Sequence, residues 1–155
     1  MYRDVDQMSA RECYQAAVAA VVPRPIAWVS TKSSDGVLNL APYSFFTVAS
    51  CNPPVLLYTQ VAQRDGSDKD TLQNLLETGE CVVNVVNAAL LEKMNMTSAS
   101  LDAAESEFSF AGVDSCPSHK VLPSSVTDSP IRYECPLREI IPVSDLPAGG
   151  SVILL

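Results

Sequence analysis

The sequence predicts a mainly β domain with a few helices, of the barrel or sandwich type. About seven short segments are rich in β-branched and aromatic residues, while only a few have the periodicity of a helix. Eleven prolines are spread along the chain, six of them between Pro117 and Pro147, which favours short segments over long helices. A Rossmann domain would need regular alternation of strands and helices and a G-x-G-x-x-G motif, and the sequence has neither.

The length and composition predict one soluble domain spanning residues 1–155. The chain has 155 residues, is 47% hydrophobic and carries a formal charge of -8, which argues against binding to nucleic acid or to an anionic membrane. The longest apolar run, residues 16–22, is too short to span a bilayer, and the polar N-terminus does not resemble a signal peptide. Five widely spaced cysteines without a C-x-x-C pair predict free thiols, no metal site and a cytoplasmic location.

Local signals place the elements of the first half. Residues 9–20 are predicted to be a helix because Ser9 and Glu12 have the spacing of a capping box. Asp35-Gly36 is a hairpin signal between two of the four strands predicted at residues 26–31, 37–41, 45–50 and 55–60. After a polar loop at 61–68, a helix is predicted at 70–78, with Asp70 as its N-cap and Gly79 as its C-terminal glycine.

The second half is less regular. A buried strand is predicted at 81–87 and a helix at 87–98, followed by a long loop at 98–130. The acidic residues Asp102, Glu105 and Glu107 are interpreted as a solvated cluster of that loop. One strand is predicted at 131–141, with Pro136 at an edge or bulge, and an apolar strand at 151–155 ends the chain. A chain that ends on such a strand looks interrupted, because an exposed apolar edge strand promotes aggregation.

Side chains that could carry out catalysis unaided are scarce. His119 is the only histidine, and it lies in a loop between Ser118 and Lys120, where a solvated residue is the simplest interpretation. The sequence has no Walker loop, no G-x-S-x-G and no pair of residues with metal-ligand spacing. If the protein is an enzyme, a bound cofactor is therefore expected to supply the chemistry.

Several short motifs follow one another in an order typical of one family. The most distinctive is Pro23-Arg24-Pro25-Ile26-Ala27-Trp28-Val29-Ser30-Thr31, and the others are Asn39-Leu40-Ala41-Pro42-Tyr43-Ser44-Phe45-Phe46, Asn52-Pro53-Pro54, Lys69-Asp70-Thr71 with Asn74, Met94-Asn95-Met96-Thr97-Ser98, Glu107-Phe108, Ser129-Pro130 and Glu134-Cys135. Together they resemble the flavin reductase-like proteins with the FMN-binding split-barrel fold.

The resemblance implies an antiparallel Greek-key split β-barrel that binds FMN without a covalent bond and forms a homodimer with flavin sites near the subunit interface. Family members commonly continue with further strands beyond the point that matches residue 155. Electrons would come from NAD(P)H or from a redox partner protein. The implied cofactor-binding residues form three groups: Trp28, Val29, Ser30 and Thr31 along the flavin ring or its chain; Ala41, Pro42, Tyr43, Ser44 and Phe45 as a second wall; and Lys69 and Thr71 at the phosphate.

Some roles stay open at the level of sequence. Trp28 is the only tryptophan, and it could stack on the flavin ring or pack in the core or in a dimer interface. Lys69 is the favoured phosphate contact because it precedes a predicted helix, whose N-terminus attracts anions, with Arg24 and Lys32 as competitors. The favoured function is an FMN-dependent oxidoreductase of the flavin reductase type. The alternatives are an FMN-binding electron carrier reduced by a protein partner and a split-barrel binding protein without flavin turnover.

Overall fold

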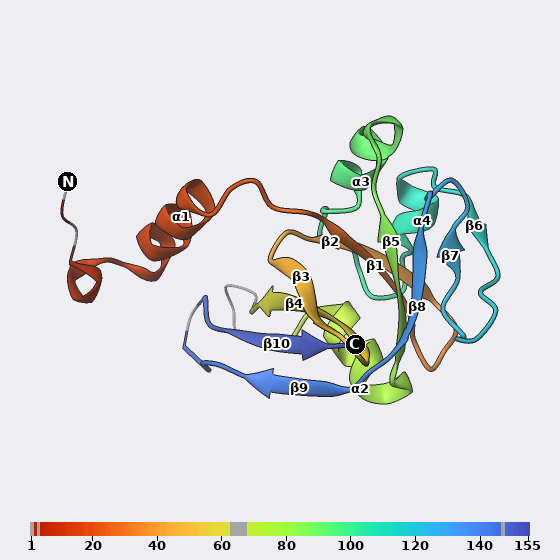
Figure 1. Ribbon diagram of the computed structural model, residues 1–155. Coiled ribbons are helices and arrows are strands. Elements are labelled where there is room, and N and C mark those ends of the chain that lie inside the picture. Colours follow the sequence, from red (N-terminus) through yellow and green to blue (C-terminus); the bar gives the residue numbers. More distant parts are fainter. Residues whose placement is uncertain (1, 3, 63–67, 147) are drawn as a thin grey trace.

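The computed structural model describes residues 2, 4–62, 68–146 and 148–155. Their elements follow the order η1 Val5–Gln7, α1 Ala10–Ala20, β1 Ala27–Lys32, β2 Leu38–Tyr43, β3 Phe46–Cys51, β4 Pro54–Val61, α2 Asp70–Thr78, β5 Glu80–Val85, η2 Ala88–Leu90, α3 Leu91–Met96, α4 Glu107–Phe110, β6 Ser115–Cys116, β7 Ser125–Val126, β8 Arg132–Pro136, β9 Glu139–Pro142 and β10 Gly150–Leu154 (Figure 1). Most of the loop expected at 61–68 lies outside the described residues.

Two four-stranded sheets form the body of the protein. The first has the strand order β2-β1-β5-β8 and the second has the order β3-β4-β10-β9, while β6 and β7 form a separate two-stranded ribbon. Every strand pair in the described residues is antiparallel. The prediction of a mainly β, antiparallel fold with a few helices is confirmed.

The chain crosses between the two sheets through the segment that contains α2, between β4 and β5, and at two short connections. Ser44 and Phe45 join β2 to β3, and Phe45 O accepts a hydrogen bond from Thr59 N of β4. At the other short connection Leu137 N donates to Gly79 O beside the first sheet, and the next amide, of Arg138, donates to Leu154 O in the second sheet. The single strand expected at 131–141 is therefore wrong: β8 and β9 belong to different sheets.

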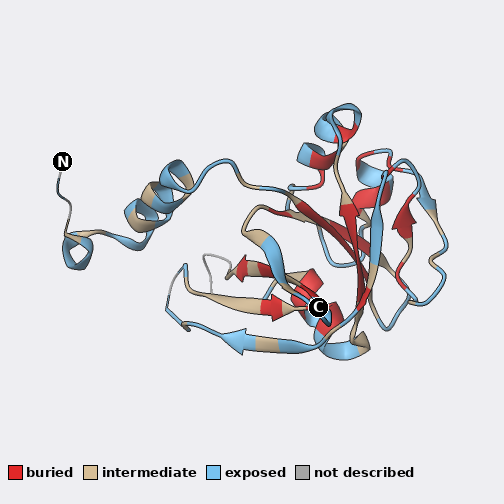
Figure 2. Ribbon diagram, in the orientation of Figure 1, coloured by how far each residue is buried: buried red, intermediate tan, exposed pale blue. Residues whose placement is uncertain are grey.

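Central strand β1 separates two hydrophobic cores, because its side chains alternate between its two faces. Ala27 and Val29 face the core between the sheets, where they pack with Tyr43, Tyr58, Leu72, Leu75, Cys81, Val83, Cys135, Ile153 and Leu155. Trp28 points to the opposite core, with Leu40, Leu90, Met94, Phe108, Ala111, Val113 and Val126. Figure 2 shows this burial concentrated in the sheets and in the elements packed on them.

The helices were predicted with different success. Helix α2 has the predicted bounds, and Gly79 ends it in the left-handed conformation at φ +70°. The capping box at the start of α1 is present, with Ser9 and Glu12 exchanging hydrogen bonds. The helix expected at 87–98 is shorter and irregular, comprising η2 and the six-residue α3. The loop at 98–130 contains the unpredicted α4, β6 and β7.

Helix α1 stands apart from both sheets (Figure 1). None of its residues is buried, and the exposed apolar side chains of this segment include Tyr14, Val21 and Val22. The helix is attached at its base, where the ring of Tyr14 meets that of Phe45 edge-on and Arg24 donates hydrogen bonds to Val18 O, Val21 O and Ser44 Oγ. We call residues 4–22 the N-terminal arm.

Two carboxylates hold the long connection after α4 against the first sheet. Glu134 of β8 accepts hydrogen bonds from the amides of His119 and Lys120, and Glu80 of β5 accepts one from Leu122 N. The His119 amide is the foremost cause that lowers the pKa of Glu134.

The described residues contain no helix long and apolar enough to cross a membrane, and all five cysteines are free.

Two neighbouring tyrosines of the core between the sheets differ in how their hydroxyls are satisfied. Their rings lie 4.6 Å apart between centroids. The hydroxyl of Tyr43 donates to Gln60 Oε1 at 3.1 Å, whereas the buried hydroxyl of Tyr58 has no hydrogen-bond partner among the described residues.

Replacing each tyrosine by phenylalanine should therefore have opposite effects on stability. Tyr43→Phe should lower the free energy of unfolding by about 1 kcal/mol, because it leaves the buried Gln60 carbonyl without its donor. Tyr58→Phe should leave the free energy unchanged or raise it, because it removes an unsatisfied polar atom. Denaturant unfolding of both variants measures the difference, and equal losses would contradict the explanation.

Candidate functional site

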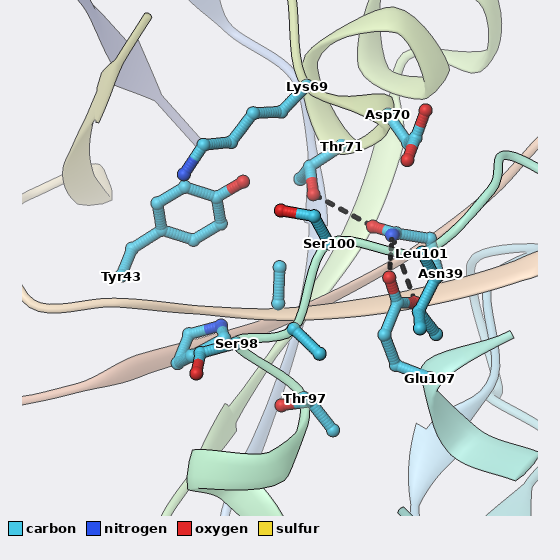
Figure 3. A pocket seen from close by; sticks show the side chains of 13 residues that line it. Asn39, Tyr43, Lys69, Asp70, Thr71, Thr97, Ser98, Ser100, Leu101 and Glu107 are labelled. Carbon is cyan, nitrogen blue, oxygen red and sulfur yellow. Dashed lines mark hydrogen bonds between the residues drawn. The ribbon is translucent and has the colours of Figure 1, made fainter. Parts of the chain in front are cut away.

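A cleft opens where four parts of the chain meet (Figure 3). They are strand β2, the start of α2, the segment that follows α3, and helix α4. Its volume is about 160 Å³. The lining residues are Asn39, Ala41, Pro42, Tyr43, Lys69, Asp70, Thr71, Thr97, Ser98, Ala99, Ser100, Leu101 and Glu107. One wall is mainly apolar, and the remainder offers hydroxyls, one amide, two carboxylates and one ammonium group.

Lys69 supplies the positive charge of the cleft. It occupies the N-cap position of α2, and the first helical hydrogen bonds run from Leu72 N and Gln73 N to its carbonyl. The amides of Asp70 and Thr71 precede these bonds, so they belong to the helix end that attracts anions. Asp70 is the first helical residue and not the N-cap, which corrects the prediction, and Lys69 makes no side-chain cap.

The ammonium group of Lys69 is held over an aromatic ring. Its Nζ lies 5.4 Å from the centroid of the Tyr43 ring, within the range of a cation–π contact, and Figure 3 shows the two side chains facing each other. Burial lowers the pKa of Lys69. The charge is therefore only partly solvated and available to a ligand on the same side of the cleft.

A buried carboxylate anchors the opposite end of the cleft. Glu107 of α4 is 5% exposed, and its two oxygens accept hydrogen bonds from Asn39 Nδ2 at 3.1 and 3.0 Å. Leu40 N donates to Glu107 Oε2 at 2.9 Å. Burial raises the pKa of Glu107 above its ordinary value, while these donors act against the rise. The interpretation of Glu107 as part of a solvated acidic cluster is therefore wrong.

Further hydrogen bonds connect Asn39 to α2 and β1. Asn39 Oδ1 accepts from Thr71 Oγ1 at 2.8 Å and from Thr31 Oγ1 at 3.3 Å. Thr31 Oγ1 in turn accepts from Asn74 Nδ2 at 3.0 Å. We call Glu107, Asn39, Thr71, Thr31 and Asn74 the wall network, and Figure 3 shows its Glu107–Asn39–Thr71 part.

The structure brings some of the predicted site residues together. Ala41, Pro42, Tyr43, Lys69 and Thr71 all line the cleft. Trp28 does not: its side chain has no exposed surface, and its Nε1 donates to Thr97 Oγ1 at 2.8 Å, so in this chain it is a core residue.

The other predicted residues lie behind or beside the cleft. Val29, Ser30 and Thr31 have no exposed surface. Ser44 and Phe45 contact Arg24 and Tyr14 at the base of the N-terminal arm. Of the competing cations, Arg24 is engaged by those contacts, and Lys32 lines a separate surface hollow with Gly36 and Thr78.

Sequence reasoning assigned no ligand role to several lining residues. Asn39 and the Thr97–Ser98 pair were noticed only as parts of family motifs, and residues 99–101 and Glu107 were assigned to loop. The presence of Glu107-Phe108 among those motifs is the one sequence signal that singled out Glu107. The described residues contain no group of three or more His, Cys, Asp or Glu side chains that could hold a metal ion.

Comparison with known proteins identifies the family. Residues 19–153 match the family described as "Flavin reductase like domain". The chain belongs to this flavin reductase-like family. Membership implies an oxidoreductase domain that works with a flavin, and it confirms the resemblance found in the sequence.

Individual relatives agree with this assignment. An uncharacterised protein of Halalkalibacterium halodurans is 42% identical over 138 residues, which are 89% of this chain and 66% of that protein. The solved structure of nitrilotriacetate monooxygenase component B from Bacillus cereus superposes with a TM-score of 0.94 at 29% identity, covering 99% of this chain and 77% of the other. For the 2-nitrobenzoate 2-nitroreductase of Pseudomonas fluorescens the TM-score is 0.86 at 30% identity, covering 99% and 72%.

The solved structures also identify the type of fold. A protein from Shewanella frigidimarina with a split-barrel domain has a TM-score of 0.84 at 21% identity, covering 99% of this chain and 76% of the other, so the predicted split barrel is confirmed. The chain spans about two thirds of the length of the curated relatives it matches.

Proposed function

We propose that this protein binds FMN and acts as a flavin reductase-type oxidoreductase, passing electrons from NAD(P)H through FMN to an acceptor. The observation that carries the proposal is the cleft of a flavin reductase-like domain, in which one ammonium group at a helix N-terminus faces an apolar and hydroxyl-rich wall. The similarity to a nitroreductase and to a monooxygenase component supports electron transfer as the class of reaction.

The donors of the cleft suit the parts of FMN. A phosphate dianion needs positive potential and N–H donors, which Lys69 and the first amides of α2 supply. The hydroxyl groups of the FMN linker could form hydrogen bonds with Ser98 and Ser100, and the flat flavin ring could pack on Ala41, Pro42 and Tyr43. Because the cleft of about 160 Å³ is smaller than typical cofactor pockets of about 300 Å³ or more, it would enclose only part of the molecule.

The protein's own residues would orient the cofactor and hold its charge. When bound, the flavin supplies hydride acceptance and electron release, and this chemistry needs no general acid or base from the protein. Lys69 would balance the phosphate charge, and the apolar wall at Ala41–Tyr43 would exclude water from one side of the ring. The lack of a histidine among the described residues that line the cleft agrees with this division of work.

The first test is the spectrum and the turnover of the purified protein. We expect flavin absorbance in the visible range after addition of FMN and gel filtration, and oxidation of NADH or NADPH that depends on added flavin. FAD and riboflavin are the comparison flavins. Retention of FMN without oxidation of either nicotinamide would instead indicate an electron carrier reduced by a protein partner, and retention of no flavin would overturn the proposal.

We further propose that the protein is a homodimer and that a redox partner receives its electrons. The N-terminal arm supports the dimer, since a helix without a buried residue gains stability only by packing against something else. The exposed apolar side chains Val48 of β3 and Ile141 of β9 add to the surface that a second copy would cover. The similarity to a monooxygenase component supports a separate acceptor protein.

Light scattering at micromolar concentration should therefore give twice the chain mass of 16.6 kDa. Tyr14→Glu, which places a charge on the exposed apolar face of the arm, should shift the protein toward the monomer. Gln15→Glu changes the charge by the same amount one position along the helix and should keep the dimer. A monomer in the unmodified protein, or equal behaviour of the two variants, would contradict this proposal.

Lys69→Ala should weaken FMN binding about ten- to a hundredfold. A charge-assisted hydrogen bond to a phosphate contributes on the order of 1–3 kcal/mol, and about 1.4 kcal/mol corresponds to a tenfold change in Kd. Riboflavin, which has no phosphate, should bind equally well before and after the change. Lys32→Ala, which removes a lysine that does not line the cleft, is the control and should affect neither ligand. An equal loss for both flavins would exclude Lys69 as the phosphate contact.

A further inference from the structure

The hydrogen bonds of the wall network have a fixed direction. Carboxylate oxygens only accept hydrogen bonds, so the side of Asn39 that faces both oxygens of Glu107 must be its NH₂ group. The amide oxygen of Asn39 then faces Thr71 and Thr31, and it can only accept. Thr71 and Thr31 must therefore donate their hydroxyl protons to Asn39.

This direction removes Thr71 from the donors of the cleft. A threonine hydroxyl has one proton, and that of Thr71 is held by Asn39 Oδ1 at 2.8 Å. The Thr71 side chain is also 1% exposed, so only lone pairs, with little free surface, are available to a ligand. A phosphate dianion offers acceptors alone and cannot form a hydrogen bond with such a group.

The charges of the cleft divide in the same way. Lys69, the one cation among the described lining residues, stands at one end over the Tyr43 ring, with the carboxylate of Asp70 next to it in sequence, and Glu107 lies at the other end, behind Asn39 (Figure 3). An anion is favoured near Lys69 and disfavoured near Glu107, so hydrogen bonding and charge select the same position for it.

We propose that Glu107 is a positioning residue of the flavin site. It fixes the orientation of Asn39, so that Asn39 Oδ1 binds the hydroxyl proton of Thr71. Lys69 and the first amides of α2 then recognise the phosphate, and the Thr71 side chain does not. The inference rests on the proposed binding of FMN, but the direction of the wall network can be tested without flavin. Discrimination between FMN and riboflavin is then concentrated in Lys69 and in the backbone that Thr71 holds in place.

Exchanging the two polar groups tests the direction of the network. Glu107→Gln turns an NH₂ group toward the NH₂ group of Asn39, and Asn39→Asp sets two carboxylates against each other. The double variant Asn39→Asp with Glu107→Gln restores the pattern. In it the new glutamine donates to the new aspartate and accepts from Leu40 N, while the second aspartate oxygen still faces Thr71 and Thr31. Net charge and size stay those of the original pair.

We expect each single variant to unfold at lower denaturant concentration than the flavin-free parent, and the double variant to recover most of the loss. If Glu107 only fills space, the isosteric Glu107→Gln would be neutral, and the two changes would add in the double variant. Either result would overturn the inference whether or not the protein binds flavin.

The second experiment compares Thr71→Val with Thr71→Ser for both flavins. Thr71→Val should change the Kd of FMN and the Kd of riboflavin by the same factor, within about twofold, while Lys69→Ala affects FMN alone. Thr71→Ser keeps the hydroxyl and should restore both affinities. A loss for Thr71→Val that is at least about tenfold greater for FMN than for riboflavin would overturn the inference and leave the proposed function standing. Failure of the unmodified protein to bind either flavin would overturn the proposed function, and the assignment of phosphate recognition with it.

Discussion

The bidentate contact between Glu107 and Asn39 is the interaction on which the cleft depends. A carboxylate removed from water is tolerated only where donors replace its hydration, and here two bonds from Asn39 and one from Leu40 N do so. Each of those donors belongs to β2, so α4 can pack at one place only along that strand. The same contact orients Asn39, and Asn39 in turn holds the start of α2 through Thr71.

The position of Lys69 follows from this chain of contacts. Helix α2 is attached to the first sheet by Leu72 and Leu75 on its apolar face and by Thr71 and Asn74 on its polar face. Four anchors over little more than one turn fix the direction of the helix start. Lys69, one residue before the helix, is thereby brought over Tyr43 and not into solvent, at the expense of part of its hydration. The packing of α2 thus sets the position of the positive charge in the cleft.

Elements with local signals could be predicted from the sequence, and those defined by distant partners could not. The bounds of α2 follow from leucines on one face and from Gly79, all close together in the chain. The segment around Glu107 has the composition of a solvated loop, and the partner of Glu107, Asn39, is 68 positions away. The alternation at 131–141 continues across Leu137, but the amides of Leu137 and Arg138 bond to Gly79, beside the first sheet, and to Leu154, in the second sheet. Nothing local marks that division into β8 and β9.

Trp28 is a second example of a residue whose role depends on distant partners. Its neighbours Ala27 and Val29 face the core between the sheets, whereas its indole lies in the core beneath α3 and α4. Its hydrogen bond to Thr97 fixes the segment whose next residues, Ser98 to Leu101, form one side of the cleft. The motif that suggested a ring-stacking tryptophan thus reaches the cleft through Thr97 and not through the indole face. On the other side, β2 leaves the cleft at Tyr43, and the next two residues hold the base of the N-terminal arm. The cleft wall and the arm are therefore joined at this point, and in the proposed homodimer this connection would link the subunit interface to the apolar wall.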